Sequence, residues 1–138
     1  MSNTKKGSML IEMLIFVAVS SVVIVVMLVG FKSVLFNLSL DNEVIFLKKV
    51  LDYAQDYAYT NQKQVDFVIE GNGAKYYIKA EDKELKKRDL PKRIKLSGQP
   101  VSFTKNITPS NGTTLTLTLD KKEKKVIIDP SNGRIRIP

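Results

Sequence analysis

The hydrophobic pattern of the chain is dominated by one long uncharged run near its beginning. From Met13 to Phe31 no residue is charged, and only Ser20, Ser21 and Gly30 interrupt the apolar side chains. About 20 apolar residues are enough for a helix to cross the hydrocarbon core of a bilayer. The run therefore predicts a membrane-spanning helix.

The residues that flank this run indicate how it is oriented. Lys5 and Lys6 precede it, whereas Lys32 follows it with Asp41 and Glu43 further on. Positive charge next to a span marks its cytoplasmic side. We expect a single-pass protein of the cell membrane, with a short cytoplasmic N-terminus and an exported C-terminal part.

A helical pattern continues beyond the span. Apolar residues recur at spacings of three and four, which is the period of an amphipathic helix, and no proline occurs before Pro91. We expect one helix from about Ser8 to Asn61, weakened near Gly30 and Asp41-Asn42. The apolar positions of its second half are Val34, Leu35, Leu38, Ile45, Leu47, Val50, Leu51, Ala54, Tyr57 and Ala58.

The remainder of the chain alternates between apolar and polar residues, as short strands do. Two charged segments, 81–89 and 120–125, are expected to be exposed, the second as a hairpin tip. A small antiparallel sheet must bury its apolar face, and the helical stripe from Ile45 to Ala58 can cover it. The pattern predicts an α+β fold with strands at Val65–Ile69, Ala74–Ala80, Ile94–Ser97, Val101–Thr104, Thr113–Leu119, Val126–Ile128 and Arg134–Ile137.

Composition narrows the possible functions. The 138 residues include neither Cys nor His, which excludes disulfides, thiolate metal sites and histidine bases. We find no nucleophile beside a base, no paired acids and no metal-ligand cluster. Gly71-Asn72-Gly73 is too short for a phosphate loop and is interpreted as a turn. The sequence predicts neither an enzyme nor a bound cofactor or metal.

The net charge is concentrated in the predicted exported part. Residues 61–138 contain 17 Lys or Arg and 9 Asp or Glu, so they carry the whole formal net charge of +8. Such a field favours polyanions, namely nucleic acid, anionic lipid or wall polymer. The alternative is a lysine-rich surface that serves solubility and has no special partner.

Glu12 lies at the entrance of the apolar run and requires an explanation. A carboxylate within a membrane is costly, so it indicates a functional site and a partner of opposite charge. One alternative is an ordinary signal anchor in which Glu12 reaches the interface. Another is a secretory signal peptide cleaved near Ala18-Val19-Ser20, although the apolar run continues well past that point.

The stretch from Gly7 to Glu12, preceded by two lysines, resembles the class III signal of type IV pilins and pseudopilins. The resemblance implies cleavage by prepilin peptidase between Gly7 and Ser8. Glu12 would then be the fifth residue of the mature chain, and its carboxylate would pair with the new amine of its own or a neighbouring subunit during filament assembly. It also implies N-methylation of Ser8, although the family more often has Phe or Met there.

Motifs in the head narrow the resemblance further. Leu51-Asp52-Tyr53-Ala54-Gln55, Asn111-Gly112-Thr113 and 129–136 (DPSNGRIR) are similar to the H-type group of pseudopilins, which includes FimT minor pilins and ComGD competence pseudopilins. Length, lysine content and absent cysteines are most similar to ComGD. The resemblance implies a minor subunit of a DNA-uptake pilus at the cell surface. Implied partners are other ComG pseudopilins, the prepilin peptidase, an assembly ATPase and a membrane platform protein.

This interpretation divides the chain into a leader peptide (1–7), a transmembrane and assembly helix (8–31), an amphipathic helix (32–62) and a β-rich extracellular head (63–138). Two other functions remain open. One is a pseudopilin of a type II secretion system. The other is a bitopic membrane protein whose exported domain binds a polyanion and never joins a filament.

The C-terminal Gly133-Arg134-Ile135-Arg136 has two interpretations. In FimT-like pilins a tail of this type is implicated in DNA binding. Two arginines at i and i+2 of a strand share one face and can both meet backbone phosphates. In the alternative they are solvated residues of an edge strand, and Ile135 and Ile137 face the core.

Overall fold

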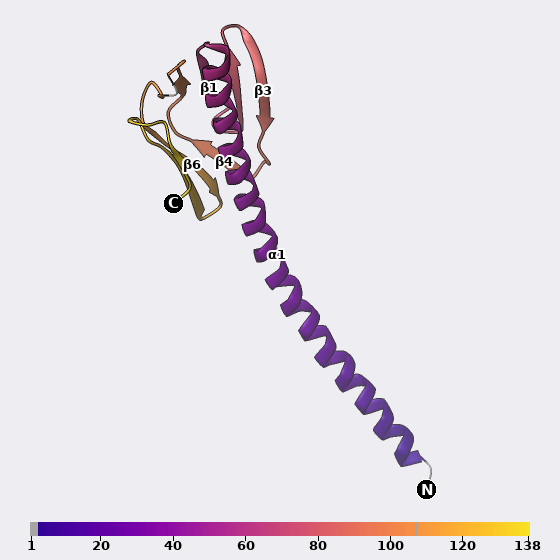
Figure 1. Cartoon of the computed structure of the whole chain (residues 1–138). Coiled ribbons are helices and arrows are strands. Elements are labelled where there is room, and N and C mark those ends of the chain that lie inside the picture. The colour runs from indigo at the N-terminus through magenta and orange to yellow at the C-terminus, as the bar shows by residue number, and fades with distance from the viewer. Residues whose placement is uncertain (1–2, 107) are drawn as a thin grey trace. The chain divides into compact units, whose positions relative to one another are not determined.

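The computed structural model describes residues 3–106 and 108–138, and the side chains of residues 3–7, 33, 36 and 37 lie outside that description. Residues 1 and 2 of the expected leader peptide are therefore not described. The described residues form one helix, α1 (Asn3–Asn61), followed by eight strands (Figure 1). It divides into two compact units between Leu38 and Ser39.

The helix begins five residues earlier than the pattern predicted, at Asn3 instead of Ser8. It ends at Asn61 as expected, and it continues without interruption through Gly30 and through Asp41-Asn42. Neither position breaks the helix, because a single glycine or a polar pair lowers helix propensity by only about 1 kcal/mol.

In the first unit the described side chains from Ser8 onward are almost all exposed and apolar. The segment Ser8–Lys32 is 25 residues long, none of it is buried within the protein, and it is long and apolar enough to cross a membrane. A helix that is apolar on every side needs lipid or other helices around it.

The second unit contains two four-stranded antiparallel sheets where the sequence pattern indicated a single small one. The first has the order β3-β2-β1-β5 and the second β4-β6-β7-β8. Together with α1 they confirm the α+β fold class. The strands are β1 (Val65–Glu70), β2 (Lys75–Ala80), β3 (Lys83–Asp89), β4 (Ile94–Ser97), β5 (Val101–Phe103), β6 (Thr113–Leu119), β7 (Lys122–Ile128) and β8 (Ile135–Arg136).

Two charged segments differ from the expectation. Residues 83–89 form β3, an edge strand that the sequence did not predict, although most of its side chains are exposed as expected. The tip between β6 and β7 is only Asp120-Lys121, because β7 begins at Lys122. Most side chains of both segments are exposed to solvent, so neither segment needs alternating apolar residues. Their strand conformation is maintained by backbone hydrogen bonds to the neighbouring strand, which the sequence pattern does not reveal.

The core lies between the C-terminal part of α1 and both sheets. Leu47, Leu51, Ala54 and Ala58 of α1 are fully buried, as the predicted stripe required. Ile45 is the exception, because it is 49% exposed. The stripe instead begins with Leu40 and Val44, which are buried and extend the same helical face about two turns before Leu47. The sheets contribute Val65, Phe67, Tyr76, Ile78, Ile94, Leu96, Val101, Phe103, Leu115, Leu117, Val126 and Ile128.

The two sheets are joined where the β1–β2 turn meets β4. The Leu96 amide donates a hydrogen bond to the Gly73 carbonyl at 2.9 Å, and the Leu90 amide donates to the Ala74 carbonyl at 2.8 Å. Gly73 has φ +82°, and a Cβ built on it would lie 2.0 Å from the Leu96 carbonyl oxygen. Only glycine permits this approach of the two backbones.

Candidate functional site

The first predicted site lies in α1. Gly7, Ser8 and Glu12 all belong to this helix, and the side chains of Ser8 and Glu12 are exposed. Residues four apart lie on one face of a helix, so Glu12 sits one turn above Ser8, about 6 Å along the axis. If the chain is cleaved after Gly7, the carboxylate and the new amine are thus on the same face.

The second predicted site lies in the turn before β8. The Gly133 amide donates to the Asp129 carbonyl at 2.9 Å, and the Asp129 amide donates to the Arg134 carbonyl at 3.0 Å. Asn132 Oδ1 accepts from the Arg134 amide at 2.9 Å. These bonds fix the backbone from which Arg134 and Arg136 project.

Both arginines are exposed, whereas Ile135 between them is buried. Ile137 is 39% exposed, so only one of the two isoleucines faces the core. Arg136 lies 3.8 Å from the Asp129 carboxylate, a partial neutralisation at the surface.

The arginines share an open groove of about 680 Å³ with one face of α1. The helix contributes Lys48, Asp52 and Gln55, which the sequence analysis did not select. Gln55 Nε2 donates to the Gly133 carbonyl at 3.1 Å and so holds the turn against the helix. Lys48 pairs with Asp52 at 2.8 Å. Lys48, Asp52 and Gln55 are spaced at i, i+4 and i+7, which places them on one helical face. Only the tertiary structure brings that face next to Arg134.

The groove can therefore offer three cations to a chain of phosphates, with Asp52 as a partly neutralised neighbour. Arg134 and Arg136 come from the tail, and Lys48 comes from α1. Arg134 and Arg136 are exposed and Lys48 is half-buried beside Asp52. Contacts of such cations with backbone phosphates carry no base specificity.

The turn has a measurable pH signature. Hydrogen bonds from the Ser131 hydroxyl (2.6 Å) and amide (3.0 Å) lower the pKa of the Asp129 carboxyl below its usual value, and Arg136 adds to the effect. The carboxylate therefore stabilises the folded turn at pH above the unfolded pKa. This contribution is lost as pH falls through the lower, folded pKa.

Ser131→Ala should raise the pKa of Asp129, as measured by carboxyl NMR titration, whereas Ser110→Ala on the β5–β6 connection should not change it.

Comparisons with known proteins identify the fold. No family model and no curated protein matches the chain. A crystal structure of the type IV minor pilin FimU of Pseudomonas aeruginosa is similar, with a TM-score of 0.63 and 19% identity over 72% of this chain and 92% of that one. The minor pseudopilin EpsH from the type 2 secretion system of Vibrio cholerae has a TM-score of 0.61 and 11% identity over 72% of this chain and 96% of that one. The chain therefore has the α+β fold found in these minor pilins and pseudopilins.

Proposed function

We propose that this protein is a minor pseudopilin that joins a pilus-like filament through its N-terminal helix. One observation carries the proposal: an exposed apolar segment, Ser8–Lys32, with Glu12 near its start, precedes a head of the pilin type. The apolar segment holds the subunit in the membrane before assembly and packs against other helices afterwards. Glu12 sets the register between neighbouring helices by pairing with an amine.

The processing steps follow from the same segment. Prepilin peptidase cleaves between Gly7 and Ser8, and the Ser8 amine is the site of N-methylation. The head is exported while Lys5 and Lys6 remain cytoplasmic. An assembly ATPase and a membrane platform protein then move the subunit into the filament with its fellow pseudopilins.

Mass spectrometry of the protein from the native membrane tests this proposal. The mature chain should begin at Ser8, and Gly7→Val should leave the leader attached because the peptidase then meets a branched side chain. Gly30→Ala is the matched control, since nothing lies within 4 Å of a Cβ at that position. A mature chain that begins near Ser20 or Ser21 would instead establish an ordinary signal peptide. An unprocessed chain would favour a bitopic membrane protein.

Within this function we propose a role in DNA uptake by a competence pilus. The observation that favours it is the basic exported part, whose net charge is +8, together with the arginine groove. The second candidate is a type II secretion pseudopilin, which the likeness to EpsH favours. The companion genes distinguish the two machines. A deletion strain should lose transformation in the first case and protein secretion in the second.

Direct DNA binding by the groove can be measured on residues 39–138, which contain every buried apolar residue of the described chain. This fragment should bind duplex DNA without sequence preference, with a Kd of about 10⁻⁴–10⁻⁶ M at physiological salt. Arg134→Gln with Arg136→Gln should weaken binding and make the slope of log K against log salt shallower by about 2, because each phosphate contact contributes about 0.9.

The control for this prediction removes two exposed lysines from the β6–β7 hairpin, Lys121→Gln with Lys125→Gln. Equal effects of the lysine and arginine pairs would mean that the charge acts as a diffuse field. A fragment that fails to bind DNA even at low salt would leave this subunit with an assembly role only.

A further inference from the structure

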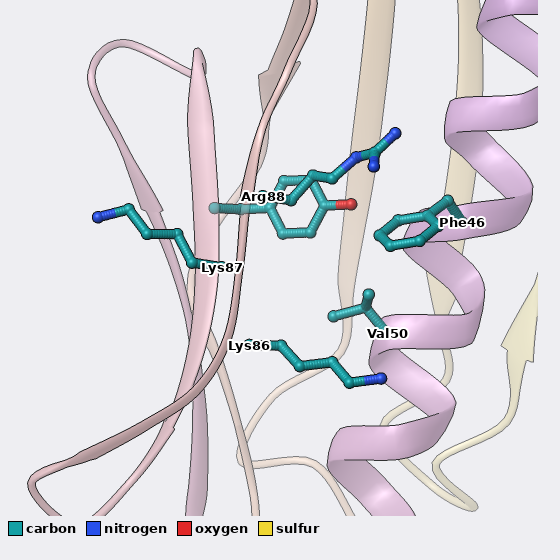
Figure 2. A pocket seen from close by; sticks show the side chains of 6 residues that line it. Phe46, Val50, Lys86, Lys87 and Arg88 are labelled. Carbon is teal, nitrogen blue, oxygen red and sulfur yellow. The ribbon is translucent and has the colours of Figure 1, made fainter.

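A second concave site lies on the head, away from the arginine groove. It is a pocket of about 190 Å³ between α1 and the edge strand β3. Phe46 and Val50 of α1 form its apolar side, and Lys86, Lys87, Arg88 and Tyr76 complete it (Figure 2). None of these residues belongs to the apolar segment Ser8–Lys32 or to the C-terminal turn and strand with Arg134 and Arg136.

Strand register explains which cations enter the pocket. Arg88 pairs with Tyr76 and Lys86 pairs with Ile78, and both partners on β2 point into the core. Directly opposed residues share a face of the sheet, so Lys86 and Arg88 point toward α1. Lys87 pairs with Tyr77 and points away from the helix (Figure 2).

The two inward cations differ in how their charge is balanced. Arg88 Nη2 lies 2.6 Å from Glu43 Oε1, and its Nε donates to Oε2 at 3.3 Å. The Glu43 side chain is only 8% exposed, so this two-point contact accounts for both of its oxygens. Lys86 Nζ lies 4.2 Å from the centre of the Tyr53 ring, and no described carboxylate lies within ion-pair distance of it. Of the two inward cations, Lys86 is therefore the one whose charge no described carboxylate balances.

The buried wall of the pocket holds an unpaired donor. Tyr76 is 1% exposed, and its hydroxyl has no hydrogen-bond partner in the described part of the chain. Burial, and secondarily the Glu43 carboxylate, raise the pKa of Tyr76 well above its usual value, so the hydroxyl keeps its proton. A buried hydroxyl without an acceptor is unfavourable and rare in folded proteins.

The size of the pocket limits what can occupy it. Its volume corresponds to about six water molecules and is below the roughly 300–1,000 Å³ of small-molecule sites. The volume is sufficient for one side chain of another protein. That side chain needs apolar carbons for Phe46 and Val50, an acceptor for Tyr76 and a negative charge for Lys86.

We propose that this pocket binds one glutamate side chain presented by an acidic segment of a partner protein. The carboxylate accepts the hydrogen bond from the Tyr76 hydroxyl and pairs with Lys86 Nζ, while the methylene groups lie on Phe46 and Val50. Glu43 does not oppose this binding, because Arg88 already neutralises it. The long side chain of Lys86 lies on an edge strand and can adjust as the ligand enters, while Arg88 stays on Glu43.

The test uses the full chain in phosphatidylcholine nanodiscs and follows backbone amide NMR signals. The probe is the peptide acetyl-EGEGE-amide, and acetyl-QGQGQ-amide is its uncharged control. We expect saturable shifts at residues around Tyr76 and Lys86 with a millimolar Kd, and at least tenfold weaker binding of the glutamine peptide. Tyr76→Phe, which keeps the ring, should weaken binding about three- to tenfold because one hydrogen bond is lost.

Two lysine variants make the test specific. Lys86→Gln should weaken binding about as much as Tyr76→Phe, whereas Lys87→Gln, one residue away on the opposite face, should change it less than about twofold. Equal effects of the two lysines would overturn the proposal, as would shifts that map elsewhere. Shifts of the pocket residues by a 12-base-pair DNA duplex, or by self-association without peptide, would identify another occupant and also overturn it. The proposal does not depend on cleavage at Gly7, so the two can fail separately.

Discussion

Glu12→Ala should leave the protein in the membrane and reduce its incorporation into filaments about a hundredfold. Alanine makes the start of the apolar segment more apolar, so insertion is retained. What is lost is the pairing of a carboxylate with an amine in a medium of low polarity. An amine left unpaired there costs about 3 kcal/mol on insertion scales, and each 1.4 kcal/mol corresponds to a factor of ten. Separation of sheared filaments from membranes, followed by immunodetection of the subunit in each fraction, measures the effect.

Two further variants separate charge from shape. Glu12→Gln keeps the size of the side chain and removes its charge, so it should behave like Glu12→Ala. Met13→Ala shortens the neighbouring exposed residue without touching a charge and should assemble nearly normally. Normal incorporation of Glu12→Ala, together with normal DNA uptake, would remove the assembly role that we propose for this residue.

The helix and its buried stripe could be predicted well because the 3.6-residue period is a local property. Ile45 was wrongly included in that stripe. Ile45 and Val44 are adjacent and equally apolar, yet Val44 is buried and Ile45 is 49% exposed. Val44 precedes Leu47 and Leu51 by three and seven residues and so shares their face, whereas Ile45 is rotated about 100° around the helix, away from the buried stripe.

The strands that alternate were predicted, and the one that does not was missed. Thr113–Leu119 has leucines on one face and threonines on the other, and the structure forms β6 over those same residues. β3 has charged residues on both faces. Even its inward residues are charged, because Lys86 and Arg88 place their long side chains over aromatic rings. Such a strand is identified only by its register with β2.

The candidate sites also fall into two groups, those that the sequence pattern reveals and those that only the tertiary structure reveals. Gly7, Ser8 and Glu12 lie within six consecutive residues, so their spacing could be read directly from the sequence. The groove joins Lys48 to Arg134 across more than eighty residues, and the pocket of Tyr76 requires the pairing of β2 with β3. Neither is visible before the tertiary structure is known.

The similarity to FimU and EpsH concerns the fold alone. These two proteins share the fold but serve a type IV pilus and a type 2 secretion system, respectively. A fold that serves both machines determines how a subunit is built, and the surface side chains determine which partners it meets. The groove and the pocket, which lie on that surface, are therefore the places where the function of this chain can be tested.

Gly73→Ala should destabilise the head more than any other small change that we consider, by about 3–5 kcal/mol. Two costs combine at this position. The backbone conformation, φ +82°, is unfavourable for alanine by roughly 1–3 kcal/mol. In addition, the new Cβ would lie 2.0 Å from the Leu96 carbonyl oxygen, so the two backbones must separate. That separation stretches the 2.9 Å hydrogen bond from the Leu96 amide to the Gly73 carbonyl and loosens the junction between the sheets.

Gly71→Ala in the same turn is the matched control, because it isolates the first cost from the second. Gly71 also has a positive φ, +63°, but a Cβ there would meet only the Ala74 Cβ at 3.8 Å, an ordinary contact. We therefore expect a loss of about 1 kcal/mol for Gly71→Ala. Thermal unfolding of residues 39–138, followed by circular dichroism, measures both variants. The midpoint temperature should fall by about 4–8 °C per kcal/mol in a domain of this size. Equal losses for the two variants would mean that the approach of Gly73 to Leu96 contributes nothing, and that the sheets are held together by the apolar core alone.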